Sequence, residues 1–355
     1  MRILFYLPTI GSGGAERVIT TVANELSPRG HEIYIIVRWE IKNKYQLNDN
    51  ISLIVLPQDK KNIVKNLRKQ VISIKPDINV GVLPSGFEEL LEATKDMNIP
   101  IIASDHQNYH FFKSEHEKYV RNEVYKSADV LTVLTKADYE YMKDKLHNMK
   151  VMYNPISFPI LTEPVKKEKK ILCMGRLDAW KIKGFDTIIS IWGRIAKGFP
   201  DWTLIIAGDD KGSGDFEKLH WMARQAGVED RIQFTGWVNN VDKLMQSCAI
   251  FALPSREEGF PCVLLEAMSQ GCASIAFEIR GNIKEIMTDC YDGYLVPDNN
   301  LTLFVAKLCR LMKREDIRTR FSKNALESVK RFEIDKVGDE WERLLIETVK
   351  KGRKK

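Results

Sequence analysis

Short apolar runs alternate along the chain with segments in which apolar residues recur every three or four positions. The runs have the length of buried β-strands, and the periodic segments have the pattern of amphipathic α-helices. In the first half, strands are expected at 3–7, 32–37, 52–56, 78–83, 100–104 and 130–134, and helices at 15–26, 61–74, 87–95, 115–126 and 136–146. Strands that alternate with helices predict a parallel, doubly wound α/β sheet.

The same alternation resumes in the second half, after a segment at 155–170 that has the prolines and charged residues of a linker. Strands are expected at 171–174, 202–207, 232–236, 249–253, 274–277 and 293–296, and helices after residue 208 and at 185–196, 263–268 and 336–350. At 355 residues the chain is too long for one typical core. We therefore expect domains at 1–160 and 161–330, followed by a helical segment at 331–355.

Composition places the chain among ordinary globular proteins, with 44% hydrophobic and 29% charged residues. No apolar stretch reaches the roughly 18 residues of a membrane-spanning helix. The apolar start resembles the front of a signal peptide, but Pro8 and the glycines after it end the run too early, which favours a first strand. The six cysteines lie between Cys173 and Cys309 without Cys-x-x-Cys spacing. This pattern indicates reduced, mostly buried thiols in a cytosolic protein.

The net charge of +6 is unevenly distributed, because basic residues crowd positions 60–75 and 350–355. Basic clusters suit nucleic acid, an anionic lipid surface or plain solvation. No nucleic-acid-binding module is recognisable, so the last two readings are favoured. Aromatic and charged residues also mix at 109–121. These could dock the lipid part of a ligand or could pack at a helix start.

The most informative stretch is Pro254–Gly271, PSREEGFPCVLLEAMSQG, which follows a predicted strand. Pro261 suits a first helical position, and glycine before a helix start lets backbone N–H groups approach an anion. Glu258 precedes the helix and Glu266 lies among its apolar residues, where a carboxylate seldom occurs without a partner. The two carboxylates could hold hydroxyl groups on either side of a phosphate. Alternatively, one caps the helix and the other is an ordinary helix residue.

Two cations lie between the strand at 171–174 and the helix at 185–196. Arg176 follows the strand, and Lys183 lies directly before Gly184 and the helix. A guanidinium fork and an ammonium beside helix N–H groups suit a diphosphate. Lys181 competes with Lys183 for this position, and surface charges at a helix start are the alternative.

The first half offers weaker signals. A glycine loop ending at Gly14 joins a strand to a helix, which is a geometry for binding phosphate, although it is neither a dinucleotide fingerprint nor a P-loop. His106 follows the strand at 100–104, and ligands of open α/β sheets bind at the carboxyl ends of strands. A structural hydrogen bond is the alternative role for this histidine.

These motifs together resemble those of the retaining glycosyltransferases of family 4. The similarity rests on the Glu258-x7-Glu266 spacing with the following Ala-Met-x-x-Gly, on Gly-Arg-Leu with the later Lys-Gly-Phe-Asp, and on the N-terminal Gly-Gly-Ala-Glu-Arg. It covers nearly the whole chain. It implies the GT-B fold, with two Rossmann-like doubly wound parallel-sheet domains facing a cleft and a last helix that crosses back onto the first domain.

The resemblance also implies a function, namely retaining transfer of a sugar from a nucleoside-diphosphate sugar, with a UDP-sugar favoured. The acceptor would be a hydroxyl of a glycan or polyprenyl-diphosphate saccharide in cell-surface polysaccharide biosynthesis. Catalytic roles fall to His106, Arg176, Lys183 and Glu258; donor binding to Gly14, Gly175, Gly208, Val238, Gly259, Phe260 and Glu266; and acceptor binding to Gly13, Glu16 and Arg17. With two cations present, no cofactor and no obligatory metal is expected.

The expected location is the cytoplasm, with peripheral attachment to the inner face of the cytoplasmic membrane as one option. Two other functions stay open at this point. One is a different GT-B sugar-nucleotide enzyme, such as an epimerase, and the other is a non-enzymatic module that binds a sugar nucleotide. A phosphorylase would need a lysine site for pyridoxal phosphate, and no such motif is recognisable.

Overall fold

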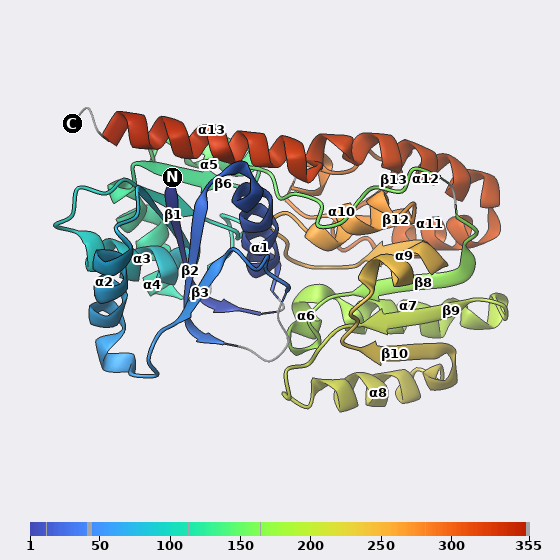
Figure 1. Ribbon diagram of the computed structural model, residues 1–355. Coiled ribbons are helices and arrows are strands. Elements are labelled where there is room, and N and C mark those ends of the chain that lie inside the picture. Colours follow the sequence, from blue (N-terminus) through green and yellow to red (C-terminus); the bar gives the residue numbers. More distant parts are fainter. Residues whose placement is uncertain (12, 41–44, 113, 164, 281, 353–355) are drawn as a thin grey trace. The chain divides into compact units, whose positions relative to one another are not determined.

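The computed structural model describes residues 1–11, 13–40, 45–112, 114–163, 165–280 and 282–352. It divides into two compact units (Figure 1). Unit 1 comprises Met1–Ser157 and Ile334–Lys355, and unit 2 comprises Phe158–Glu333. The chain therefore leaves unit 1 once, completes unit 2 and then returns to unit 1 with its last helix.

Unit 1 is built on a seven-stranded parallel sheet with the order β3-β2-β1-β4-β5-β6-β7. Its strands are β1 Arg2–Ile10, β2 Glu32–Glu40, β3 Ser52–Val55, β4 Ile78–Val82, β5 Ile101–Ser104, β6 Val130–Val133 and β7 Met149–Val151. Its α-helices are α1 Gly14–Leu26, α2 Ile63–Ile74, α3 Leu83–Thr94, α4 Glu115–Asn122, α5 Lys136–Met142 and α13 Ile334–Gly352.

Several features of unit 1 differ from the sequence prediction. Strand β1 continues through Pro8 to Ile10 rather than ending at residue 7, and α5 ends at Met142 rather than at residue 146. Strand β7 was not predicted, because three residues are too few to show a period. Helix α3 begins at Leu83 rather than at residue 87, with Pro84 in the first turn, where proline costs no hydrogen bond. Helix α4 ends at Asn122, and the predicted remainder is a 3-10 turn over Val124–Ser127.

Unit 2 contains a six-stranded parallel sheet with the order β10-β9-β8-β11-β12-β13. Its strands are β8 Glu168–Met174, β9 Thr203–Ala207, β10 Ile232–Gly236, β11 Cys248–Leu253, β12 Ala273–Glu278 and β13 Gly293–Pro297. Its α-helices are α6 Trp180–Lys183, α7 Phe185–Ile195, α8 Asp215–Gln225, α9 Val241–Ser247, α10 Cys262–Ser269, α11 Leu301–Lys313 and α12 Glu315–Ser328.

Here too the sequence prediction needs correction. Residues 168–170, expected in the linker, belong to β8, because their backbone pairs with β9 and β11 despite their charged side chains. Helices α9, α11 and α12 were not predicted. Helix α6 was not predicted either, because a single turn leaves no periodic signal.

Both cores are formed by the central strands. Every residue of β4 and of β11 is buried, as expected for parallel strands covered on both faces. All six cysteines are free; Cys173, Cys248, Cys262 and Cys272 are buried. Within the part of the chain that the structure describes, no helix has the length and apolar character needed to cross a membrane.

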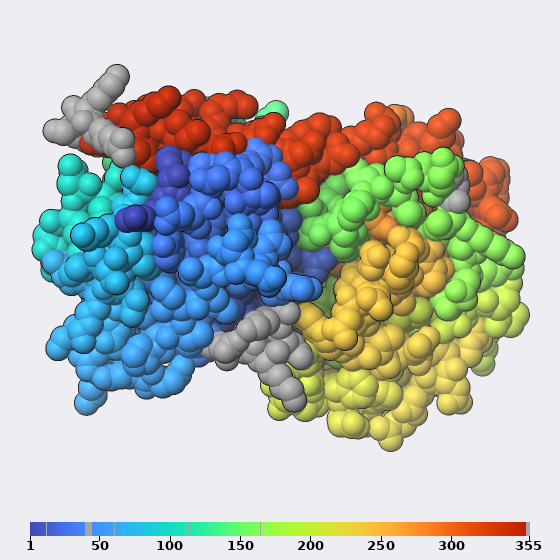
Figure 2. All heavy atoms as spheres, viewed as in Figure 1, coloured from blue at the N-terminus to red at the C-terminus, as the bar shows by residue number. Residues whose placement is uncertain are grey.

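The last helix, α13, packs against α1 in unit 1. A Cβ added at Gly338 would lie 2.7 Å from Cγ of Glu25, so the two helices approach closely there. Trp341 is 1% exposed, and Arg29 forms ion pairs with Asp339 and Glu342 of α13. Figure 2 shows α13 in red beside the blue surface of α1. The last helix thus belongs to the first unit and packs on it through one buried face.

Candidate active site

Three glycines end three neighbouring strands of unit 2 and let their backbones touch. The N–H of Gly208, after β9, donates to the carbonyl of Gly236, the last residue of β10, at 2.9 Å. Gly208 has φ +153°, and a Cβ there would lie 1.8 Å from the carbonyl oxygen of Gly175, after β8. Only glycine fits that contact. The carboxyl edge of this part of the sheet is therefore lined by backbone.

Two of the predicted site residues form an ion pair at this edge. Nζ of Lys183 lies 2.8 Å from Oε1 of Glu258, and the hydroxyl of Ser255 donates to the same oxygen at 2.8 Å. The Glu258 residue is 8% exposed, whereas the Lys183 side chain is 25% exposed. A Cβ on Gly175 would lie 3.4 Å from the Lys183 side chain. The structure thus brings Gly175, Lys183 and Glu258 together.

Lys181 and Lys183, which compete for the predicted position, have different surroundings. Lys183 is the last residue of α6, a turn that was not predicted, and Gly184, at φ +69°, leads into α7, which begins at Phe185 as predicted. The Lys183 side chain extends to Glu258, whereas Nζ of Lys181 lies 5.3 Å from the centroid of the Trp180 ring. Lys183 is the lysine beside the predicted carboxylate.

Arg176 lies at the same edge, just after Gly175. It is exposed, and its guanidinium donates to Asp178 through Nε at 2.9 Å and Nη2 at 2.6 Å. Val238, predicted to contact a nucleotide base, lies in the loop after β10 and is partly exposed. Asp210 was not read as a metal ligand, and its carboxylate accepts backbone N–H groups of Gly212 and Gly214.

The loop between β11 and α10 is held by its backbone. Pro261 is the N-cap residue of α10, so the helix begins at Cys262, one residue later than predicted. The amide of Asn282 donates to the carbonyls of Glu258 at 3.3 Å and Gly259 at 2.8 Å. The Phe260 ring is 3% exposed and packs edge-on against Phe332, so this residue offers a ligand its backbone rather than its ring.

Glu266, the second carboxylate of the motif, lies within α10. It is 3% exposed in a helix in which nearly every residue is buried. The carboxylate is therefore shielded from bulk water, whereas Glu258 is approached by the partly exposed Lys183. The two glutamates occupy different environments although one motif contains both.

In unit 1, His106 follows the end of β5 as predicted. Its Nε2 lies 3.0 Å from Oγ of Ser104, which also accepts a hydrogen bond from Thr132 at 3.1 Å. Burial lowers the pKa of His106 to about 4, although a hydrogen bond with Asn154 opposes the shift. The imidazole is therefore neutral at neutral pH, and it can donate or accept one hydrogen bond without carrying charge.

A buried ion pair that the sequence did not reveal holds the His106 loop. Nε of Arg121 lies 2.7 Å from Oδ2 of Asp105, and the two side chains are 0% and 1% exposed. The guanidinium also donates to the carbonyls of Asn108 at 3.2 Å and Phe111 at 2.9 Å. Sixteen residues separate the two charges, and no local pattern links them.

The same contacts correct one reading of segment 109–121. The Arg121 guanidinium carbon lies 4.0 Å from the centroid of the Tyr109 ring, and Tyr109 is 1% exposed. Neither residue can dock a lipid, because both belong to the core. Tyr119 remains 56% exposed, and Lys113 lies outside the described residues.

The predicted acceptor loop forms the start of α1. Gly13 is the N-cap residue and Gly14 the first helical residue; Ser12 lies outside the described residues. Oε1 of Glu16 accepts a hydrogen bond from Thr9 at 2.9 Å, and Nε of Arg17 donates to Ser157 at 2.9 Å. The two charged side chains are thus held by hydroxyl groups of unit 1.

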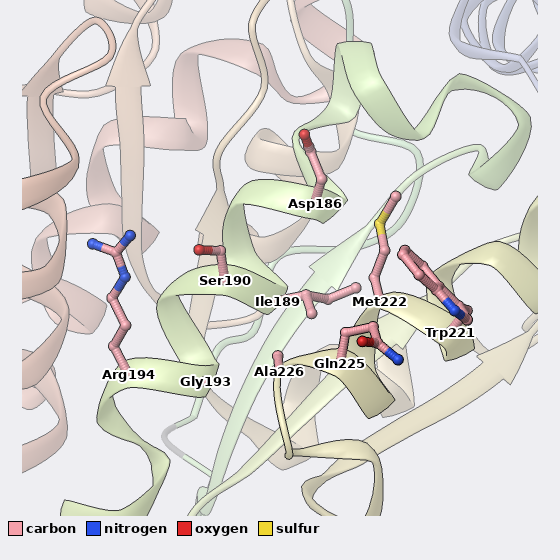
Figure 3. Close-up of a pocket in the computed structure, with 9 residues that line it drawn as sticks. All are labelled: Asp186, Ile189, Ser190, Gly193, Arg194, Trp221, Met222, Gln225 and Ala226. Atoms are coloured by element: carbon pink, nitrogen blue, oxygen red, sulfur yellow. The ribbon is translucent and has the colours of Figure 1, made fainter.

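A groove of about 420 Å³ lies elsewhere in unit 2, between α7 and α8 (Figure 3). Its lining residues are Asp186, Ile189, Ser190, Gly193, Arg194, Trp221, Met222, Gln225 and Ala226. None of them belongs to the predicted site. Asp186, which lines the groove, also forms an ion pair with Arg256, a residue of the Pro254–Gly271 stretch.

Comparison with known families assigns the class of protein. The model described as Glycosyltransferase Family 4 matches residues 12–158, and the model described as Glycosyl transferases group 1 matches residues 161–328. The chain belongs to this family of glycosyltransferases, and its two parallel-sheet units are those of the GT-B fold. The family assignment favours a glycosyltransferase over the two alternatives left open by the sequence.

Individual proteins agree over nearly the full length. A Haemophilus influenzae protein described as an uncharacterized glycosyltransferase is 28% identical, with 97% of this chain and 99% of the relative aligned. A Campylobacter jejuni α-1,4-N-acetyl-D-galactosaminyltransferase is 27% identical, with 98% and 99% aligned. The solved structure of Anabaena HepE in complex with UDP-glucose has a TM-score of 0.84 at 19% identity, with 98% and 100% covered.

Proposed function

We propose that this glycosyltransferase moves a sugar from a nucleoside-diphosphate sugar to a hydroxyl of a lipid-linked saccharide, with retention of configuration. The observation that carries the proposal is the Lys183–Glu258 pair beside the glycine-lined edge of unit 2. A partly exposed ammonium can exchange a carboxylate partner for phosphate oxygens, and glycines leave room for a ligand against the backbone.

Each residue of the site then has a role. Arg176 and Lys183 stabilise the nucleoside diphosphate as it leaves, because they place positive charge where negative charge develops. Glu258 holds hydroxyl groups of the donor sugar, and Glu266 holds those of the ribose. The N–H groups near Gly259 and Phe260 assist the phosphates. Gly175, Gly208 and Val238 complete the part of the donor site in unit 2 through their backbones.

Retention is proposed without a covalent sugar intermediate. Oε1 of Glu258, the carboxylate nearest the cations, accepts a hydrogen bond from Ser255, which it keeps when Lys183 moves to the phosphates. A carboxylate oxygen engaged in this way is a poor nucleophile. The acceptor would instead attack on the face that the diphosphate leaves, assisted by the leaving phosphate.

The donor is proposed to be a UDP-sugar and the acceptor a polyprenyl-diphosphate saccharide in cell-surface polysaccharide biosynthesis. Support comes from HepE, solved with UDP-glucose, and from the Campylobacter relative, whose name includes PP-undecaprenol. His106, neutral at neutral pH, would donate a hydrogen bond to the donor sugar or accept one from it. Gly13, Glu16 and Arg17 would contact the acceptor.

Peripheral membrane attachment on the cytoplasmic side is proposed on the basis of α2. Lys65 and Lys69 are exposed on this helix, together with Ile72, which is 54% exposed. Cations beside an exposed apolar side chain suit an anionic lipid surface. Residues 353–355 of the basic tail lie outside the described residues.

No obligatory metal is proposed, since Arg176 and Lys183 supply the positive charge that a metal would otherwise give the diphosphate. Turnover in EDTA should then equal turnover in Mg²⁺ or Mn²⁺. A rate that depends on either ion would contradict this part of the proposal.

The test is release of UDP from a panel of UDP-sugars, with and without undecaprenyl-diphosphate saccharides. We expect release to depend on one donor and one acceptor and to be lost in Glu258→Ala. NMR of the product would give the configuration of the new bond. A chain that binds no UDP, GDP or sugar derivative of either would overturn the proposal.

A further inference from the structure

Arg256, which no motif singled out, contacts the segment that contains Lys183. Its backbone N–H donates to the carbonyl of Ile182 at 2.7 Å, and its Nη1 donates to the carbonyl of Lys181. The guanidinium also binds Asp186 in the forked geometry, at 2.8 and 2.9 Å, and donates to Oγ1 of Thr187 at 3.0 Å. These contacts lie on both sides of Lys183 in the sequence.

The two segments also meet directly through their backbones. A Cβ at Gly184 would lie 2.0 Å from the carbonyl oxygen of Pro254, and Gly184 itself is at φ +69°. Lys183 therefore has a close backbone contact after it and hydrogen bonds to Arg256 before it. Glu258, the partner of Lys183, lies two residues after Arg256 in the sequence.

The guanidinium has little capacity left for a ligand. It has five N–H donors, and its two terminal nitrogens already make four hydrogen bonds to Lys181, Asp186 and Thr187. Because the planar fork matches a carboxylate, a lysine at this position could not reproduce the same set of contacts. The side chain is 42% exposed, so the pair contributes little to overall stability.

We infer that Arg256 is a positioning residue of the donor site, which acts through Asp186 to hold Lys183 opposite Glu258. This inference rests on the proposed function, since it assigns Lys183 to the diphosphate. Removing Arg256 would release the α6–α7 junction, so the ammonium would no longer be held in place before the ligand arrives.

The test is UDP binding by calorimetry and the donor KM, for Arg256→Ala, Asp186→Ala and the double variant. We expect about a tenfold loss of affinity in each single variant, because small displacements of a binding group are costly. The double variant should lose no more than either single one, because the two residues act as one unit. Arg256→Lys should restore only part of the loss.

Arg314→Ala is the matched control. Arg314 makes the same forked pair with Asp316, at 2.8 and 2.7 Å, and is 57% exposed, but it lies between α11 and α12. It should change the melting temperature as little as Arg256→Ala does and leave UDP affinity unchanged. Equal UDP affinity in Arg256→Ala and wild type would overturn the inference.

Two further outcomes separate this inference from the proposed function. If Arg256→Ala weakens binding and Asp186→Ala does not, Arg256 contacts the ligand directly and the positioning role is wrong. If the wild-type chain binds no nucleoside diphosphate, the proposed function fails and the inference fails with it. If Lys183→Ala loses UDP binding while Arg256→Ala and Arg256→Lys keep it, the inference is overturned and the proposed function is not.

Discussion

The loops that contain His106 and Glu258 each follow a buried parallel strand, yet different forces hold them. In unit 1, a fully buried ion pair between Asp105 and Arg121 fixes the loop, and the proposed site residue His106 is uncharged. In unit 2, the ion pair includes the proposed site residue Glu258 itself, and its lysine is partly exposed. The comparison teaches that one loop presents a fixed neutral hydrogen-bonding group, whereas the other presents charges that can change partners.

The largest effect is expected from removing the ion pair that holds the His106 loop. Arg121→Ala leaves the Asp105 charge buried without its partner and should cost about 3–5 kcal/mol of unit 1 stability. Urea unfolding, with hydrogen exchange of 101–134 to identify the unit, measures it. Arg68→Ala removes the exposed, forked pair with Asp96 and should destabilise the chain far less, because solvent screens an exposed pair. Equal losses in the two variants would mean that burial of the pair does not matter.

The second prediction concerns the charge of Lys183 beside the Glu258 loop. Lys183→Ala should lower kcat/KM for the donor about 100- to 1000-fold, the usual cost of removing one group that stabilises developing charge. Lys181→Ala, the matched control two residues away, should stay close to wild type. Lys183→Ala should also lower the melting temperature, because the buried Glu258 loses the ammonium that pairs with it, whereas Lys181→Ala should unfold near wild type. A larger kinetic defect in Lys181→Ala would reverse the assignment.

The third prediction uses pH to sharpen the contrast in charge. The pKa of His106 is about 4 in the folded chain, against about 6.5 unfolded, so the unfolded state binds the proton first. Stability contributed by the neutral imidazole is complete above pH 6.5 and falls by up to about 3 kcal/mol as the pH drops to about 4.

Wild type and His106→Asn should therefore converge in stability as the pH is lowered from 6.5 to 4. The comparison between variants is needed, because the raised pKa of nearby Asp138, about 6 through burial, acts in the opposite direction. Parallel pH curves for the two chains would show that His106 titrates normally.

The smallest effects come from the hydroxyl groups beside the two functional residues. Ser104→Ala removes a hydrogen bond to neutral His106 and should cost about 1 kcal/mol, whereas Ser255→Ala removes one to the charged Glu258 and should cost about 1.5–3 kcal/mol. Donor kinetics and the free energy of unfolding should be measured for both variants. A larger cost for Ser104→Ala would contradict the difference in charge between the loops.

Much of this architecture is predictable from sequence, because the strands are short apolar runs and most helices have apolar residues at a helical period. The order of strand, glycine and cation that places Gly175 and Lys183 at one edge is also local. Partners distant along the chain have no such signal: Arg121 is sixteen residues from Asp105, and Arg256 is seventy from Asp186. The chemistry of the site was visible in motifs, whereas the groups that hold it in place became visible only once the chain was folded.

The position of α13 has a consequence for how the protein is made. Ile334–Gly352 completes unit 1, and Trp341 and Val337 fill its core, yet these residues follow the whole of unit 2 in the sequence. During synthesis on the ribosome, the apolar surface of unit 1 beside α1 stays exposed until unit 2 and then α13 have been synthesised. A gene fragment that ends near residue 157 would leave that surface permanently uncovered, so unit 1 should be expressed with α13 joined back to it.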